Sequence, residues 1–213
     1  MKWTDLTETI PNMIANGQAT TVLKLGVERV YSNRVDHLLR RDLYLPCSYN
    51  PEPRIPIRIR QLRAGDIARI AEHIPERLAG MKELRTCYLA VNQQDEICYM
   101  QWLIDSSQNH LRPRRMGLVL RPDEMLLEWA YTFEKFRGLG IMSYAMAELA
   151  AMAGKLGARW ALTIVEQSNV ASLKGCRNAG FRPYKLREER WRAMRTVQTY
   201  TLLPENSKYS FET

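Results

Sequence analysis

The chain has 213 residues, of which 46% are hydrophobic, and a formal net charge of +8 with an isoelectric point near 9.5. This length accommodates one substantial domain with an extension, and the hydrophobic fraction is ample for a core. The opening residues are too polar for a secretory signal and no apolar run could span a bilayer, so we expect a cytoplasmic protein without a membrane span.

The distribution of charges and cysteines narrows the classes of ligand. The positive charge favours anionic partners, but the basic residues are spread through the chain rather than gathered in an arm, so we do not expect nucleic acid. Cys47, Cys87, Cys98 and Cys176 are scattered, as are the three histidines. We therefore expect reduced thiols and no metal site.

Residues 1–56 are predicted to be an N-terminal extension that ends in a proline-rich connector. Its residues 20–30 have the apolar spacing of a helix, and residues 31–45 are irregular or strand-like. We expect the leucines of this segment to pack on the core. The alternative is a contact with a substrate or carrier protein, for which the charged candidates are Arg34, Arg40, Arg41 and Asp42.

Residues 57–104 predict a strand, two helices and a hairpin. Residues 57–62 alternate apolar and charged side chains, as in a strand with one face on a core. A helix follows with Asp66 as its N-cap, and residues 75–84 supply a second. Two apolar runs around a polar turn, residues 86–91 and 97–104, indicate an antiparallel hairpin.

A polar and basic loop, residues 106–115, follows the hairpin. Such a stretch is either a solvated connection or a wall of a binding cleft, because binding residues are frequent on loops.

The centre of the chain reads as strand, glycine turn and helix. Residues 125–133 have the apolar and aromatic composition of a buried strand, with Glu128 near the middle. Gly138 and Gly140 form the turn, and apolar residues then recur on one helical face as far as Gly157. A glycine turn that leads into a helix N-terminus presents backbone N–H groups and a positive dipole. We therefore predict a pyrophosphate seat.

The remaining elements complete an α/β pattern. Residues 158–166 indicate another strand, and a short helix begins at Asn169 and ends at a Gly-Phe pair. Residues 183–191 and 196–203 are predicted to be a closing antiparallel pair. Residues 205–213 are expected to be a frayed tail.

These motifs resemble the GNAT superfamily of N-acyltransferases, which use acetyl-CoA or another acyl thioester. The family's pyrophosphate loop has the form Gln/Arg-x-x-Gly-x-Gly/Ala. Lys135, Gly138 and Gly140 fit this form in one frame. Arg137 and Gly140 fit it in the other frame, with Met142 where Gly or Ala is usual.

The resemblance implies an α/β (α+β) domain over residues 57–204. Its fold would be a mixed, mostly antiparallel twisted sheet with helices on both faces. Two central strands would splay apart so that the pantetheine arm of the donor enters between them. The resemblance also implies that the chain could form a homodimer.

The donor-binding residues implied by the resemblance lie at the end of the first splayed strand, in the loop and at the two helix starts. They are Thr132, Phe133, Lys135, Arg137, Gly138, Leu139, Gly140, Ile141, Met142, Ser143 and Asn169.

Three residues are candidates for the chemistry. A carboxylate buried in an apolar strand has a raised pKa, which suits Glu128 to act as general base, although it could equally pair with an arginine. Cys176 stands where many family members have a tyrosine as general acid, and it is either that acid or a small core residue. Tyr184 is a further hydroxyl donor.

The sequence therefore predicts an acetyl-CoA-dependent N-acetyltransferase with a small-molecule amine as acceptor. One alternative is a long-chain acyltransferase whose donor is an acyl carrier protein, which the basic surface would suit. Another is a non-catalytic acyl-CoA-binding module, which the missing tyrosine supports.

Overall fold

The computed structural model describes residues 31–47, 50–74, 86–111, 118–193, 195–205, 207–209 and 211. The helices predicted at residues 20–30 and 75–84 lie outside these ranges, as does the second half of the predicted loop at residues 106–115. The first half of that loop is a 3-10 helix, η2 (Ser106–Leu111).

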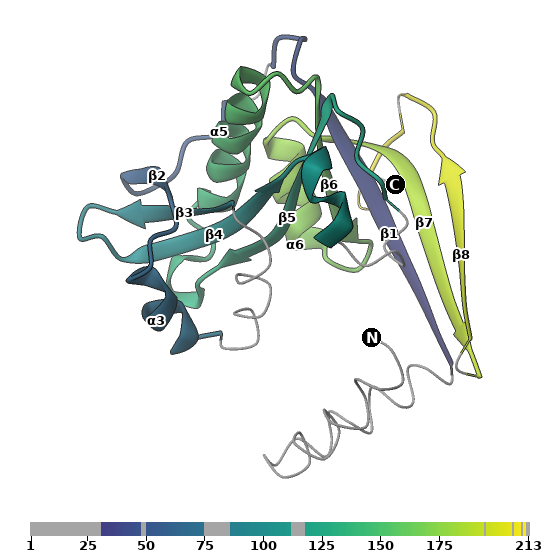
Figure 1. Ribbon diagram of the computed structural model, residues 1–213, viewed down its shortest axis with the longest axis horizontal. Coiled ribbons are helices and arrows are strands. Elements are labelled where there is room, and N and C mark those ends of the chain that lie inside the picture. The colour runs from purple at the N-terminus through teal and green to yellow at the C-terminus, as the bar shows by residue number, and fades with distance from the viewer. Residues whose placement is uncertain are drawn as a thin grey trace.

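An eight-stranded sheet in the order β2-β3-β4-β5-β6-β1-β7-β8 organises the described residues (Figure 1). Its strands are β1 (Tyr31–Asp42), β2 (Ile57–Gln61), β3 (Cys87–Asn92), β4 (Ile97–Ile104), β5 (Glu124–Thr132), β6 (Trp160–Glu166), β7 (Arg182–Arg192) and β8 (Arg195–Leu202). Only β5 and β6 pair in parallel, and the other neighbours are antiparallel. The predicted mixed, mostly antiparallel α/β fold is confirmed.

The helices are α3 (Asp66–Ala71), η4 (Glu134–Phe136), α5 (Ile141–Lys155) and α6 (Val170–Asn178). In the core, Met146 of α5 and Leu173 of α6 cluster with Leu127 of β5 and Val165 of β6. This shared apolar cluster packs both helices against the sheet where β5 and β6 meet.

The segment predicted as an extension contributes β1, which lies between β6 and β7 and pairs with both. Figure 1 shows β1, β7 and β8 running side by side as long strands. Leu38 and Leu39 point to opposite sides of the sheet, as successive strand residues do, and both are almost fully buried. The sheet therefore extends beyond the predicted domain of residues 57–204. The proline-rich connector separates β1 from β2 in sequence, but both strands belong to the same sheet.

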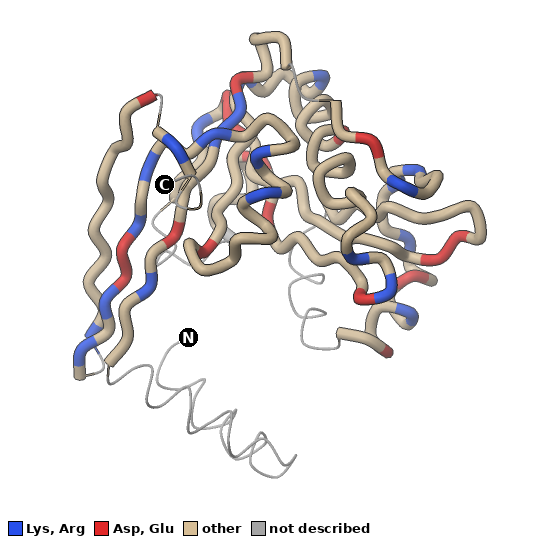
Figure 2. Tube along the Cα trace, turned by 180° about the vertical axis from the view of Figure 1, so that it is seen from behind, with Lys and Arg blue, Asp and Glu red and all other residues tan. Residues whose placement is uncertain are grey.

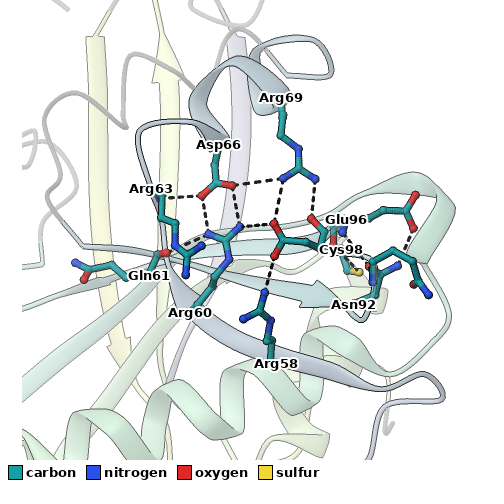
Figure 3. A network of polar contacts seen from close by, with 11 residues as sticks. Arg58, Arg60, Gln61, Arg63, Asp66, Arg69, Asn92, Glu96 and Cys98 are labelled. Carbon is teal, nitrogen blue, oxygen red and sulfur yellow. Dashed lines mark hydrogen bonds and ion pairs between the residues drawn. The ribbon is translucent and has the colours of Figure 1, made fainter.

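Asp66 does not cap α3, contrary to the sequence prediction, because Gly65 occupies the N-cap position. Its carboxylate instead accepts hydrogen bonds from Arg60 Nη1 and Nη2, at 2.6 and 2.8 Å, and from the Arg63 backbone N–H (Figure 3). Arg60 belongs to β2, so this largely buried bidentate ion pair ties α3 to the edge of the sheet.

The described part of residues 205–213 is not frayed, contrary to the prediction. Tyr209 is buried within the cluster of α5 and α6, and its hydroxyl donates to the Phe181 carbonyl. The aromatic side chain of Tyr209 packs in the cluster that α5 and α6 share, and this contact holds residues 207–209 in place.

Candidate active site

The two central strands β5 and β6 pair over three residue pairs only, from Glu124 and Trp160 to Leu126 and Leu162. Beyond that point a cavity of about 510 Å³ lies between them. Its lining includes residues 128–130 of β5, residues 163–166 of β6, and side chains of α5, α6 and β7. The strands therefore splay, and the cavity occupies the opening.

A β-bulge in β5 borders this cavity. Trp102 of β4 lies opposite Glu128 and Met100 lies opposite Tyr131, so two residues of β5 face one residue of β4. Trp129, within the bulge, has a φ of 55°. A bulky residue at positive φ is an outlier that costs about 1–3 kcal/mol, and such outliers cluster at functional sites.

Glu128 immediately precedes the bulge and lines the cavity, with only 9% of its surface exposed. Met142 of α5 and Cys176 of α6 line the same cavity, as does Asn169, which precedes α6. The structure therefore brings Glu128, Cys176 and two of the predicted donor-binding residues together.

The glycine loop has the geometry that the sequence predicts. Gly138 and Gly140 have φ values of 78° and 75°, and α5 begins at Ile141. A Cβ atom on Gly140 would lie 3.1 Å from the Glu52 carbonyl oxygen. Position 140 therefore requires glycine for its backbone conformation and for the close approach of the proline-rich connector.

The space beside Gly138 is open, because a Cβ atom there would meet nothing within 4 Å. The first amides of an α-helix have no partner within the helix, and they carry the positive end of its dipole. An accessible turn before these amides fits a pyrophosphate group. The residues present therefore suit the predicted donor.

Two basic side chains flank the loop. Lys135 Nζ lies 2.8 Å from Glu96 Oε1 and so turns toward the β3–β4 hairpin. Arg137 contacts Glu134 Oε1 at 3.2 Å and donates from Nε to the Thr132 carbonyl at 3.3 Å. Arg137 therefore lies at the end of β5, where the pantetheine arm is expected, whereas Lys135 lies farther from it.

Other predicted donor-binding residues differ in their surroundings. The Phe133 backbone N–H donates to the Cys98 carbonyl of β4 at 3.1 Å, so this group does not face the opening. Ile141 and Ser143, in the first turn of α5, are buried. The Leu139 carbonyl accepts a hydrogen bond from the Arg54 backbone N–H at 2.9 Å.

Met142 and Asn169 belong to the two helices that border the cavity. A Cβ atom on Gly175 would lie 3.0 Å from Met142 Sδ, so the Met142 side chain crosses from α5 to α6. Asn169 caps α6, because its side chain accepts a hydrogen bond from the Ser172 backbone N–H at 3.1 Å. The predicted cap is confirmed, and Met142 narrows the gap between the helices.

Cys176 is fully buried, and its Sγ lies 3.8 Å from Met146 Sδ. Burial raises the pKa of this thiol to about 12. A group with so high a pKa is a poor proton donor toward a thiolate, whose conjugate acid has a pKa near 8.5. These surroundings match the core-residue interpretation of Cys176.

Tyr184 lines a different cavity, at the end of β1, and the cavity of Glu128 does not include it. Burial raises the pKa of its phenol to about 12, and its ring lies 5.2 Å from the Arg40 guanidinium carbon. The structure therefore does not bring Tyr184 together with Glu128.

Sequence reasoning did not foresee the charged wall of the Glu128 cavity. Arg34 and Arg187 line it, and both contact Asp36, which is fully buried. Arg187 donates to Asp36 Oδ2 at 2.8 and 3.1 Å, and Arg34 Nε donates to Oδ1 at 2.9 Å. Asp36 and Arg187 face each other across β1 and β7, so only the strand register reveals the pair.

Within the described ranges, no three His, Cys, Asp or Glu side chains come together as metal ligands would. No helix in the described part of the chain has the length and apolar character needed to cross a membrane.

The sequence matches no protein-family model and no curated protein. The fold is similar to a GCN5-related N-acetyltransferase from Sphaerobacter thermophilus, with a TM-score of 0.52, 18% identity and coverage of 82% of this chain and 57% of that one. The fold is also similar to an acetyltransferase of the GNAT family from Colwellia psychrerythraea, with a TM-score of 0.53 and 13% identity. The similarity covers 86% of this chain and 62% of that one.

A third similar structure is the glucosamine N-acetyltransferase region of a fungal multi-domain β-N-acetylglucosaminidase. Its TM-score is 0.57 at 12% identity, with coverage of 85% of this chain and 23% of that one. The chain spans about three-fifths of the length of the two bacterial structures. These similarities establish that the chain has the GNAT fold.

Proposed function

We propose that this protein transfers an acyl group, most simply acetyl, from acyl-CoA to a primary amine of a small-molecule acceptor. The observation that carries the proposal is the cavity between β5 and β6. Glu128, a buried carboxylate, lines this opening between the splayed strands, and so does Met142 in the first turn of α5, the helix that follows the glycine loop. A donor seat and a proton acceptor at one opening are what acyl transfer to an amine requires.

The donor would be held mainly by backbone groups. The amides that follow Gly138 and Gly140 would bind its pyrophosphate, with the positive charge of Arg137 and Lys135 nearby. Arg54, whose backbone N–H is bonded to the loop, adds a further cation that sequence reasoning missed. When bound, the thioester supplies the activated acyl carbonyl.

Glu128 is proposed as the general base. An amine must lose a proton to attack a carbonyl carbon, and a carboxylate lining the cavity can accept it directly or through water. A backbone N–H of β5 near the bulge would stabilise the oxyanion of the tetrahedral intermediate. Because the thiol of Cys176 has a pKa of about 12, we propose that it packs the core and that no dedicated acid protonates the departing thiolate.

The test is Glu128→Gln, measured as release of free thiol from acetyl-CoA with a panel of primary amines and as calorimetric affinity for acetyl-CoA. Loss of a general base is expected to lower the rate about 10²–10⁴-fold while the affinity stays unchanged. Glu148→Gln on the exposed side of α5 is the matched control, and its rate should equal that of the unmodified protein. An unchanged rate in Glu128→Gln would exclude this role.

A non-catalytic acyl-CoA-binding module is the second candidate, because the buried Cys176 cannot replace the tyrosine that many family members use. Titration with acetyl-CoA, a long-chain acyl-CoA and free CoA separates the candidates. Binding without turnover across the amine panel would favour the module. Preference for the long-chain donor would favour the alternative with an acyl carrier protein.

A further inference from the structure

A second cavity, of about 690 Å³, lies at the end of β1. Its walls come from the last residues of β1, the first residues of β6 and β7, and the end of β8. The arginine and aromatic residues of the lining are Arg40, Arg41, Arg159, Arg182, Trp160 and Tyr184. No step of the proposed acyl transfer uses this cavity.

Arg40 is flanked by aromatic rings from both neighbouring strands. Its guanidinium carbon lies 4.5 Å from the ring centre of Trp160 on β6 and 5.2 Å from that of Tyr184 on β7. Ring contacts of this kind engage the charge of a guanidinium and supply no oxygen or nitrogen acceptor for its five N–H donors. The two rings therefore hold Arg40 in place without satisfying its hydrogen bonds.

The donors of Arg40 have no acceptor among the described residues, where its contacts are with aromatic rings alone. The neighbouring Arg41 donates from Nη1 to the Ala179 carbonyl at 3.0 Å. Its Nε is buried and has no hydrogen-bond partner among the described residues. Buried polar groups are almost always paired in folded proteins. Arg41 Nε is such a buried group, and the half-buried donors of Arg40 line the cavity, where a ligand can supply acceptors to them.

The charges around the cavity indicate the sign of that ligand. Four arginines line it, against the carboxylates of Asp42 and Glu205. Asp42 lies 3.4 Å from Arg159 and offsets its charge. With four arginines and two carboxylates, the lining carries an excess of two positive charges.

We propose that this cavity binds a small polyanion, a molecule with at least two negative charges on phosphate or carboxylate groups. Both groups present paired oxygens that match the forked donors of arginine. Arg40 is the central binding residue, and Arg182 and Arg41 supply the surrounding charge. Tyr184 then serves to orient Arg40 rather than to donate a proton in acyl transfer.

This cavity is separate from the proposed donor seat. The glycine loop lies at the start of α5, whereas Arg159 follows the end of that helix, and Leu43 beside the cavity approaches Gly154 in its last turn. Fifteen helical residues span about 22 Å at 1.5 Å per residue. A small anion bound at one end cannot reach the other.

The probes are inorganic pyrophosphate and citrate, titrated by calorimetry into the full chain at two salt concentrations. Sulfate serves as a simpler oxyanion for comparison. Arg40→Gln removes the central charge of the cavity, and Arg137→Gln removes a positive charge at the donor seat. Arg195→Gln, on the exposed strand β8, removes a positive charge that belongs to neither site. We expect Arg40→Gln to weaken binding of at least one probe tenfold or more, while Arg195→Gln and Arg137→Gln each retain a site of unchanged affinity.

Arg182→Gln is a second variant, for use if Arg40→Gln fails to fold, and it should weaken the same probe. Stronger binding of pyrophosphate would assign a phosphorylated ligand, and stronger binding of citrate a polycarboxylate. The proposal is wrong if neither probe binds, or if Arg40→Gln and Arg195→Gln have equal effects. Loss of pyrophosphate binding in Arg137→Gln alone would show binding at the donor seat and overturn the second site.

Discussion

The two halves of the sheet are held together by different forces. Every residue of β4, which lies inside the sheet, is buried, whereas β8 at the far edge has one partly buried position. The strands β1 and β7 between them carry charged side chains, seen as mixed blue and red in Figure 2, and a buried ion pair joins Asp36 to Arg187. We call β2 to β5 the apolar half of the sheet, because apolar packing stabilises it. The strands β6, β1, β7 and β8, on the other side of the cavity, form the polar half, which polar contacts stabilise in large part.

The largest loss of stability is expected in the apolar half. Trp102 of β4 is fully buried opposite Glu128, so Trp102→Ala removes a large contact area and leaves a cavity. The free energy of unfolding should fall by about 3–5 kcal/mol, measured by urea denaturation. Val197→Ala on the exposed face of β8 should change it by less than about 0.5 kcal/mol. Equal losses in the two variants would contradict the contrast between the halves.

In the polar half, Asp36→Asn should be the most damaging change. Asp36 is fully buried and forms an ion pair with Arg187, which is itself only 6% accessible to solvent. We expect a loss of about 3 kcal/mol in the same denaturation experiment, because removing the charge of one partner from a buried ion pair is costly. Asp123→Asn breaks a solvent-exposed contact with Arg121, and it should cost less than about 1 kcal/mol. A cost for Asp36→Asn no larger than this control would exclude the ion pair as a main support.

Local signals allowed much of the site to be predicted from the sequence. The positions of Gly138, Gly140 and Asn169 follow from backbone requirements that act within a few residues, and the structure has β5, α5, β6 and α6 close to their predicted bounds. The position of Glu128 in the middle of an apolar strand also predicted its burial. Short-range physics was sufficient for these elements.

Features that depend on distant pairing could not be predicted. The pattern of β1 fits an extension as well as a central strand, and only its pairing with β6 and β7 distinguishes the two. The same pairing brings Asp36 to Arg187 and places Tyr184 beside Arg40 rather than near Glu128. Tyr209 was missed because its burial depends on the space beside α6, which its own sequence does not reveal.

The glycine loop lies between β5 and β6 along the chain, and a matched pair of substitutions tests its two constraints. Gly138→Ala introduces a side chain at positive φ into open space, and we expect a loss of about 1 kcal/mol. Gly140→Ala has the same backbone cost, and its Cβ also meets the Glu52 carbonyl, so about 2 kcal/mol should be lost. Thermal unfolding measures both values. A larger loss for Gly138→Ala would contradict the close approach of the connector.

The smallest expected effect is a pH dependence that arises in the polar half. His37 of β1 is 4% exposed, and both its ring nitrogens are buried without a hydrogen-bond partner in the described ranges. Burial lowers the pKa of His37 below its ordinary value of 6.5, and the charge of Asp36 opposes this only in part. Below about pH 6.5 the unfolded chain therefore binds a proton that the folded chain does not.

The free energy of unfolding should consequently fall as the pH drops below about 6.5, by up to about 1.4 kcal/mol for each unit by which the pKa is lowered. Urea denaturation between pH 5 and 8 measures this slope. His37→Leu should reduce the slope, because leucine does not titrate, whereas the exposed His110→Gln should retain it. An identical slope in His37→Leu would show that other groups control the acid response, and the polar half would then owe its pH sensitivity to its ion pairs.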